Sequence, residues 1–216
     1  MNTKRIISLA LAVVMLASVM SFTSCDILDQ ILGNVTGGAN GKNALLMEAE
    51  YTYMDNVAGA GLSDNTSGLG MIYGHGTDAD KEMWSNGYYV GYMYNTNTVL
   101  TFEFESSAAT TATITFRLAC EQGDLVLQSG ENVDILVNGE AQFFQWDIKA
   151  SEMSNAKFYD YKLTDVELAE GANKIEIVVI EKVGSLVDYV KVVASDASVE
   201  LSWEPHTDNP TRRDEV

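Results

Sequence analysis

Three acidic residues have sequence surroundings in which an isolated charge would be costly. Asp188 lies within an otherwise apolar run near the end of the chain, where a strand is predicted to begin. Glu48 and Glu50 lie in a predicted strand much earlier, and the two-residue period of a strand places their side chains on one face. Carboxylates buried together repel each other and are destabilising without a partner. They therefore need partners, or else they are solvated or partly hydrogen-bonded acids.

Hydrolytic chemistry has little support in the sequence. Its two histidines are His75, in a glycine-rich stretch, and His206, near the C-terminal end. No serine or cysteine stands in a nucleophile motif, and Cys120, in a strand-like run, is expected to be a small buried residue. Carboxylates are numerous, so composition alone does not exclude a two-acid glycosidase. We expect a protein that is not an enzyme.

The first 25 residues have the features of an export signal. Lys4 and Arg5 precede an apolar stretch, residues 6–19, that is too short to span a membrane. Small residues before Cys25 resemble a bacterial lipobox, although Phe22 stands where leucine is usual. We therefore expect lipidation of Cys25, with ordinary secretion as the alternative. One lipid would hold the exported protein at the bacterial cell surface or at a periplasm-facing membrane without a spanning helix.

The charge balance narrows the choice of partners. The chain has 13 basic and 31 acidic residues, and loss of Lys4 and Arg5 with the signal leaves a net charge of −20. Nucleic acid and anionic lipid headgroups are disfavoured partners for such a chain. Neutral polymers and divalent cations remain compatible with it, although an excess of acid also simply keeps an exported protein soluble.

Short strands are the elements that must position these residues. Alternation is cleanest over residues 98–105, where Phe102 and Phe104 point one way, and Asn138-Gly139 is a turn signal. Further strands are predicted over residues 44–54, 87–94, 110–120, 134–137, 159–168, 173–181, 187–194 and 199–203. Sustained helical periodicity is missing. The sequence therefore predicts an all-β fold, an antiparallel β-sandwich.

The sequence divides into four parts. We expect a lipoprotein signal peptide over residues 1–24, a flexible tether over 25–43, a β-sandwich over 44–204 and a disordered tail over 205–216. Two long connections, residues 55–86 and 141–157, interrupt the predicted strands. Connections of that length are usually functional or surface excursions.

Several short motifs resemble, in the same order, those of carbohydrate-binding modules of families 6 and 35, which are jelly-roll sandwiches of the galactose-binding-like type. They are Leu46–Glu50, Ser85–Tyr92, Thr98–Phe104, Ile114–Ala119, Val137–Gly139, Leu168–Ile175 and Val187–Val190. The first resembles the opening acid-Ala-Glu strand, and the last resembles the closing strand with its aspartate. Together they span residues 46–194. The resemblance implies a jelly roll and glycan or polysaccharide binding.

The resemblance also implies a structural calcium ion between the first and last strands. By position, its ligands are Glu48, Glu50 and Asp188. Calcium takes about six to eight oxygen ligands, many from carboxylates or backbone carbonyls, so it would resolve the repulsion among these acids. Solvated or partly hydrogen-bonded acids remain the alternative.

A sugar site built on aromatic rings at the loop end of the sandwich is implied as well. Tyr92 matches the aromatic residue after the family's Val-Gly pair. Tyr159 and Tyr161 lie near its second platform, and Trp146 is in a connection that can reach the same rim. For each of these side chains, packing within the sheets is the alternative.

Leu186 departs from the family pattern. Many members have an asparagine at this position, two residues before the closing aspartate, where it binds a sugar hydroxyl. Two hypotheses therefore stand. The first is a non-catalytic carbohydrate-binding surface lipoprotein with structural calcium. The second is a structural or protein-interaction domain on the same fold, binding other surface proteins after loss of the standard sugar site.

Overall fold

The computed structural model describes residues 42–56, 71–74, 85, 88–93, 96–120, 123–149, 157–181, 185–206 and 212–214. Cys25, with the predicted signal peptide and most of the predicted tether, lies outside these ranges, as does His75. Within the ranges, no helix is long and apolar enough to cross a membrane.

A first sheet runs in the order β11-β6-β13-β4-β3-β15, and β1 also pairs with β13. Its strands are β1 (Ala44–Glu48), β3 (Met71–Gly74), β4 (Tyr88–Met93), β6 (Thr110–Cys120), β11 (Tyr159–Leu168), β13 (Ser185–Ala194) and β15 (Arg212–Asp214). β1 pairs with β13 from Ala44, opposite Val193, to Glu48, opposite Tyr189. The first and a late strand of the domain are therefore neighbours.

A second sheet runs in the order β14-β5-β12-β8-β9, and β2 also pairs with β5. Its strands are β2 (Tyr53–Asn56), β5 (Thr98–Ser106), β8 (Val133–Val137), β9 (Glu140–Ala141), β12 (Gly171–Val179) and β14 (Leu201–Ser202). Asn138 and Gly139 join β8 to β9 with positive φ angles of 52° and 87°. A two-residue hairpin turn of type I′ requires positive φ at both positions, which explains the predicted turn.

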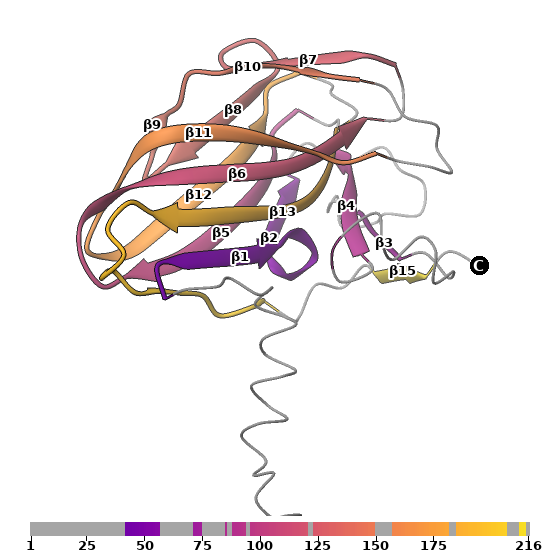
Figure 1. Cartoon of the computed structure of the whole chain (residues 1–216). Helices are drawn as coiled ribbons and strands as arrows, with labels where there is room; N and C mark the ends of the chain where they lie inside the picture. The colour runs from indigo at the N-terminus through magenta and orange to yellow at the C-terminus, as the bar shows by residue number, and fades with distance from the viewer. Residues whose placement is uncertain are drawn as a thin grey trace, which may run out of the picture. The chain divides into compact units, whose positions relative to one another are not determined.

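The chain crosses repeatedly between the two sheets. β4, β6, β11 and β13 belong to the first sheet, whereas β5, β8, β12 and β14, which alternate with them along the chain, belong to the second (Figure 1). Among the described strands, all pairs are antiparallel except β15 with β3. This is a jelly-roll sandwich, and the predicted fold class is confirmed.

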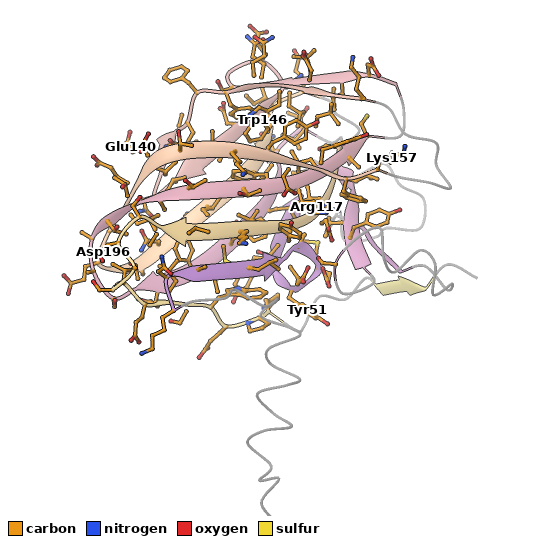
Figure 2. All side chains as sticks on the ribbon, viewed as in Figure 1. Tyr51, Arg117, Glu140, Trp146, Lys157 and Asp196 are labelled. Carbon is orange, nitrogen blue, oxygen red and sulfur yellow. The ribbon has the colours of Figure 1, made fainter. Side chains whose placement is uncertain are left out.

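A two-stranded ribbon lies beside the edge of the first sheet. It consists of β7 (Leu125–Gln128) and β10 (Gln145–Ile148), and Trp146 of β10 is labelled in Figure 2. The Trp146 ring packs on Phe116 of β6, with ring centroids 5.5 Å apart. The ribbon therefore extends the core beyond the two main sheets.

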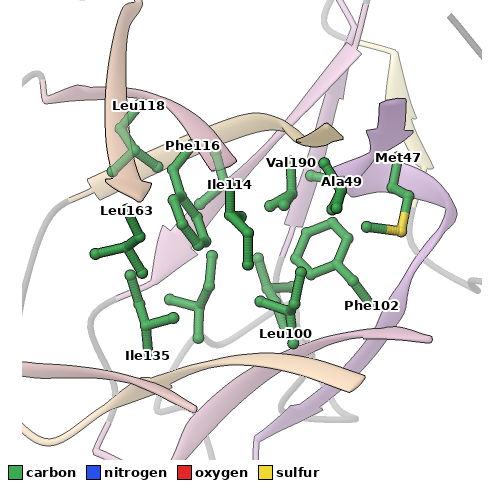
Figure 3. Packing of buried hydrophobic residues seen from close by; sticks show 14 of the residues in the cluster. Met47, Ala49, Leu100, Phe102, Ile114, Phe116, Leu118, Ile135, Leu163 and Val190 are labelled. Carbon is green, nitrogen blue, oxygen red and sulfur yellow. The ribbon is translucent and has the colours of Figure 1, made fainter. Parts of the chain in front are cut away.

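The core lies between the sheets and follows from the alternation of the strands. Phe102 of β5 and Ile114 and Phe116 of β6 all enter this core and are fully buried, and Figure 3 shows Phe102 lying near Val190 and Ala49. Truncating such a ring to alanine typically costs about 3–5 kcal/mol of stability. Cys120 of β6 is buried in this core, and no disulfide occurs among the described residues.

The structure differs from the predicted strands mainly in the short elements. The predicted strand over residues 44–54 is broken by a 3-10 turn, η1 (Ala49–Tyr51), between β1 and β2. β7 was not predicted, and β3, β9, β10 and β15 lie in segments predicted as connections or tail. Strands of two to four residues carry too few alternations to be recognised in a sequence.

Candidate functional site

The three predicted acids lie together and are buried. Glu48 ends β1, Glu50 lies in η1 and Asp188 lies in β13, and each is at most 1% exposed. The pairing of Glu48 with Tyr189 places it beside Asp188. The prediction that Glu48 and Glu50 share a strand face is wrong, since β1 ends at Glu48 and the 3-10 turn positions Glu50.

Ser85 links two of the acids. Its backbone N–H donates to both carboxylate oxygens of Asp188, at 2.9 and 3.1 Å. Its hydroxyl lies 2.9 Å from Asp188 Oδ1 and also contacts Glu48 Oε2. Ser85, which comes from a distant segment, thus bridges β1 and β13. We call Glu48, Glu50, Asp188 and Ser85 the acid cluster.

Arg117 of β6 neutralises part of the charge in the acid cluster. Its Nε donates to Asp188 Oδ2 at 3.1 Å, and its Nη1 donates to Asp160 at 3.2 Å. Tyr189 supports the arrangement, since its ring lies 5.8 Å from the guanidinium carbon and its hydroxyl lies 3.4 Å from Asp160. The acid cluster thus holds three acidic side chains beside one guanidinium.

Burial dominates the electrostatics of the acid cluster. It raises the pKa of Glu48 to about 9, with further increases from the charges of Glu50 and Asp188, and the Ser85 hydroxyl opposes this increase. It also raises the pKa of Asp188 to about 7, although Ser85 and Arg117 both stabilise the ionised carboxylate. The ion pair therefore does not fully offset the loss of water around Asp188.

A β-bulge explains how an acid fits inside an apolar strand. The register between β13 and β6 shifts between Val187 and Tyr189, so Val187 and Val190 both enter the core. Asp188 is thereby left to face Arg117. Leu186 pairs with Ala119 and is 5% exposed, so β13 includes it, whereas the sequence predicts a strand that begins only at residue 187.

The donor atoms of the acid cluster suit a hard cation. Carboxylate and hydroxyl oxygens are the ligands that calcium prefers, and the cluster has more acid than base. In the part of the chain that the structure describes, however, no three acidic, histidine or cysteine side chains meet closely enough to form an assembled metal site. Calcium would have to draw the three carboxylates together.

Two of the four predicted sugar-contacting aromatic residues contact each other. The rings of Trp146 and Tyr161 have centroids 5.4 Å apart, and the Tyr161 hydroxyl donates to the backbone carbonyl of Asp147 at 3.1 Å. Phe144 packs against Trp146 at 4.3 Å. These rings are partly buried against the core, so they attach the ribbon to the sheet.

The other two aromatic residues are placed differently. Tyr159 lies two residues before Tyr161 on β11 and is 44% exposed, so its ring is accessible on the same face of the strand. Tyr92 lies in β4, but its side chain is outside the described part of the structure. The predicted sugar contacts of Tyr92, Trp146, Tyr159 and Tyr161 remain predictions.

A large groove, which sequence reasoning missed, lies on the outer face of the second sheet. It has a volume of about 1000 Å³. Register places Thr101, Glu103 and Glu105 of β5 beside Glu176, Lys174 and Ala172 of β12, and Ser202 of β14 beside Glu105. Except for Glu176, these residues line the groove, and the small side chains of Thr101, Ala172 and Ser202 leave space above the sheet.

Aromatic rings close one part of the groove. Tyr53 of β2 stacks on His206, with ring centroids 4.0 Å apart and planes 26° apart, and Tyr53 remains 50% exposed. The backbone N–H of His206 donates to the carbonyl of Tyr51 at 2.7 Å, which docks the segment after β14 over the sheet. Trp203 and Glu204 of the same segment also line the groove.

The groove could not be recognised from the sequence because its parts come from unrelated segments. The outward alternation of Glu103 and Glu105 predicted a polar face, but not a hollow one. His206 was assigned to a disordered tail, whereas the structure docks it on Tyr51 and Tyr53. Figure 2 shows Tyr51, by η1, far from Trp146, by β10, so the groove and the ribbon aromatics are separate.

Comparison with known proteins gives matches among solved structures. No protein-family model matches the chain, and no curated protein matches its sequence. A native family 35 carbohydrate-binding module from Clostridium thermocellum is 16% identical, with 69% of this chain and 96% of the module covered and a TM-score of 0.48. Xyl-CBM35, in complex with a glucuronic acid containing disaccharide, is 13% identical, with 72% and 95% covered and a TM-score of 0.47.

A larger protein is also similar over part of its length. The Podospora anserina GH26-CBM35 β-(1,4)-mannanase is 18% identical over 79% of this chain, with a TM-score of 0.47, and the chain spans 30% of that protein. The structures that this chain resembles are thus mostly family 35 carbohydrate-binding modules, the family whose motifs its sequence resembles.

Proposed function

We propose that this protein is a non-catalytic carbohydrate-binding lipoprotein of the bacterial surface with a structural calcium site. The groove on the second sheet is the observation that carries the sugar-binding part of the proposal. Its volume of about 1000 Å³ is enough for several sugar rings. Its lining combines an exposed aromatic side chain with carboxylates, a lysine and an amide.

Each part of the groove has a role in this proposal. The apolar face of a sugar ring stacks on Tyr53, which the neighbouring His206 ring holds in place. Sugar hydroxyls pair with polar side chains on the floor, among them Glu103 and Lys174. The small residues Ala172 and Ser202 give the chain of sugars room above the sheet.

A glycan array of plant, host and microbial polysaccharides, with calcium present, tests sugar binding. We expect Tyr53→Ala to lower affinity for the bound glycan about tenfold or more, because a stacking contact is lost. Phe143→Ala is the matched control, since Phe143 is 93% exposed and does not line the groove. Loss of binding in Tyr92→Ala or Tyr159→Ala, with Tyr53→Ala unaffected, would place the site at the loop end. No binding to any glycan would refute the proposed function.

The calcium part of the proposal is supported by the burial of three acidic side chains in the acid cluster. Glu48, Glu50 and Asp188 would hold the ion, whose charge would stabilise the ionised form of these buried carboxylates. Calcium titration followed by calorimetry and thermal unfolding tests it. Unchanged calcium content and unchanged thermal stability in Glu50→Ala would refute it.

The lipid anchor part rests on the sequence around Cys25. Mass spectrometry of the mature protein from membranes should find a lipid-modified Cys25 at its N-terminus, and Cys25→Ser should release the protein from the membrane fraction. Recovery of wild-type protein in the soluble exported fraction would favour ordinary secretion.

The second hypothesis, a structural or protein-interaction domain, is favoured by one observation. Leu186 is a buried strand residue that cannot offer the polar group expected at a standard loop-end sugar site. If the glycan array is negative, crosslinking at the cell surface would test for protein partners instead.

A further inference from the structure

The groove is lined by more acidic than basic side chains. Three glutamates line it: Glu103 and Glu105 on β5, and Glu204 after β14, all with exposed side chains. In the part of the chain that the structure describes, none of the three takes part in an ion pair. Their carboxylates therefore face the space that a ligand would fill.

The one lysine that lines the groove is already paired. Lys174 lies directly across from Glu103 in the strand register, but its Nζ contacts Glu176 Oε1 at 3.0 Å. A ligand carboxylate would have to compete with Glu176 for this ammonium group while lying beside Glu103. The groove thus offers an incoming anion several like charges and no unshared cation among its lining residues.

From this arrangement we infer that Glu103 and Glu105 make the groove selective for neutral sugar chains over uronic-acid chains. The inference rests on the proposed function, since it concerns the ligand class of the same groove. Like charges placed across an interface disfavour the wrong partner more than they strengthen the right one. A hydroxymethyl group beside these carboxylates can donate a hydrogen bond, whereas a uronate at the same place is repelled and cannot donate.

Neutral and oxidised forms of the same oligosaccharide test this inference. Cellohexaose and mannohexaose would each be compared with the form whose primary hydroxyls are oxidised to carboxylates, by calorimetry on the full domain with calcium present. We expect the neutral form to bind about tenfold or more tightly at low salt, with a smaller difference at high salt because salt screens exposed charges.

Variants assign the effect to named residues. Glu103→Gln with Glu105→Gln should raise affinity for the oxidised chains about tenfold relative to affinity for the neutral chains, because the two repelling charges are gone. Glu131→Gln with Glu167→Gln is the matched control, because it changes the net charge equally at exposed positions outside the groove. The control pair should leave both affinities unchanged.

The possible results separate this inference from the proposed function. Equal or tighter binding of the oxidised chains by the wild-type protein overturns the selectivity and leaves carbohydrate binding intact. An equal gain in the control pair overturns the assignment to Glu103 and Glu105, because net charge would then explain it. Failure of every neutral probe, here and on the glycan array, overturns both.

Discussion

The acid cluster and the groove contain the same kind of side chain in opposite surroundings. Glu48, Glu50 and Asp188 are enclosed by protein, whereas Glu103 and Glu105 lie on an exposed sheet face. Burial raises the pKa of Glu48 and Asp188 far above the usual range. Burial therefore makes the ionised carboxylates of the acid cluster costly, whereas those of the groove stay in contact with solvent, and the predictions below test this difference.

The largest expected effect is the pH dependence of stability without calcium. Because the folded-state pKa values of Glu48 and Asp188 are raised to about 9 and about 7, the folded protein holds more protons than the unfolded chain above about pH 4. The free energy of unfolding in a chelator should therefore fall by several kcal/mol as the pH rises to about 9. Urea unfolding at a series of pH values measures it.

Glu48→Gln tests how much of this pH dependence of stability comes from Glu48. It removes the group whose pKa burial raises most, so the decline in stability should become shallower and end near the pKa of Asp188. Added calcium should likewise oppose the decline, since a bound cation favours the ionised carboxylates. Stability that rises with pH in chelator would contradict the burial of these acids.

A smaller effect is expected from breaking one ion pair in each region. Arg117→Met removes the guanidinium from fully buried Asp188 and should lower the free energy of unfolding by about 3 kcal/mol near neutral pH without calcium. Lys174→Met breaks the partly exposed pair with Glu176 and should cost less than about 1 kcal/mol. Similar losses from the two variants would contradict the comparison.

Two serines provide a finer test. Ser85→Ala removes the hydroxyl that contacts Glu48 and Asp188 and should cost about 1–2 kcal/mol in thermal or urea unfolding. Ser202→Ala, in the groove, should stay within about 0.5 kcal/mol of wild type because this side chain is exposed. A neutral Ser85→Ala would show that the bridge between the strands is not needed.

The smallest effect concerns the groove glutamates themselves. Glu103→Gln with Glu105→Gln should leave the unfolding temperature nearly unchanged, because both side chains are exposed and no ion pair among the described residues includes them. Any change should appear in ligand preference instead. A marked loss of stability would mean that these residues, like the acid cluster, support the fold.

Residues with regular alternation were predictable from the sequence. Phe102 and Phe104 point to one side, as their alternation predicts, and enter the core, and the Asn138-Gly139 turn is where the sequence places it. Asp188 was identified because a charge in an apolar run has few explanations, and Glu48 and Glu50 because their motif resembles the opening strand of the family. These features depend on residues close together in the chain, so a short stretch of sequence is enough to predict them.

Features that depend on distant segments could not be predicted. The bulge at Asp188 and the 3-10 turn at Glu50 arise from strand pairing, which no short window reveals. Ser85 and Arg117 reach Asp188 from segments far away in the chain, and neither stood out by type. The groove likewise needs Tyr53 and His206 to meet, at opposite ends of the domain sequence.

The pairing of β1 with β13 has a mechanical consequence. The chain enters the domain at Lys42, whose carbonyl accepts a hydrogen bond from Leu201, and β1 then pairs with β13 from Ala44 to Glu48. Tension applied on the N-terminal side of Lys42 would act on β1 before any other strand. It would reach Glu48 only after the earlier hydrogen bonds between β1 and β13 had broken. The acid cluster at that end of β1 is thus placed to hold the first strand to β13 when the chain on the N-terminal side of Lys42 is under tension.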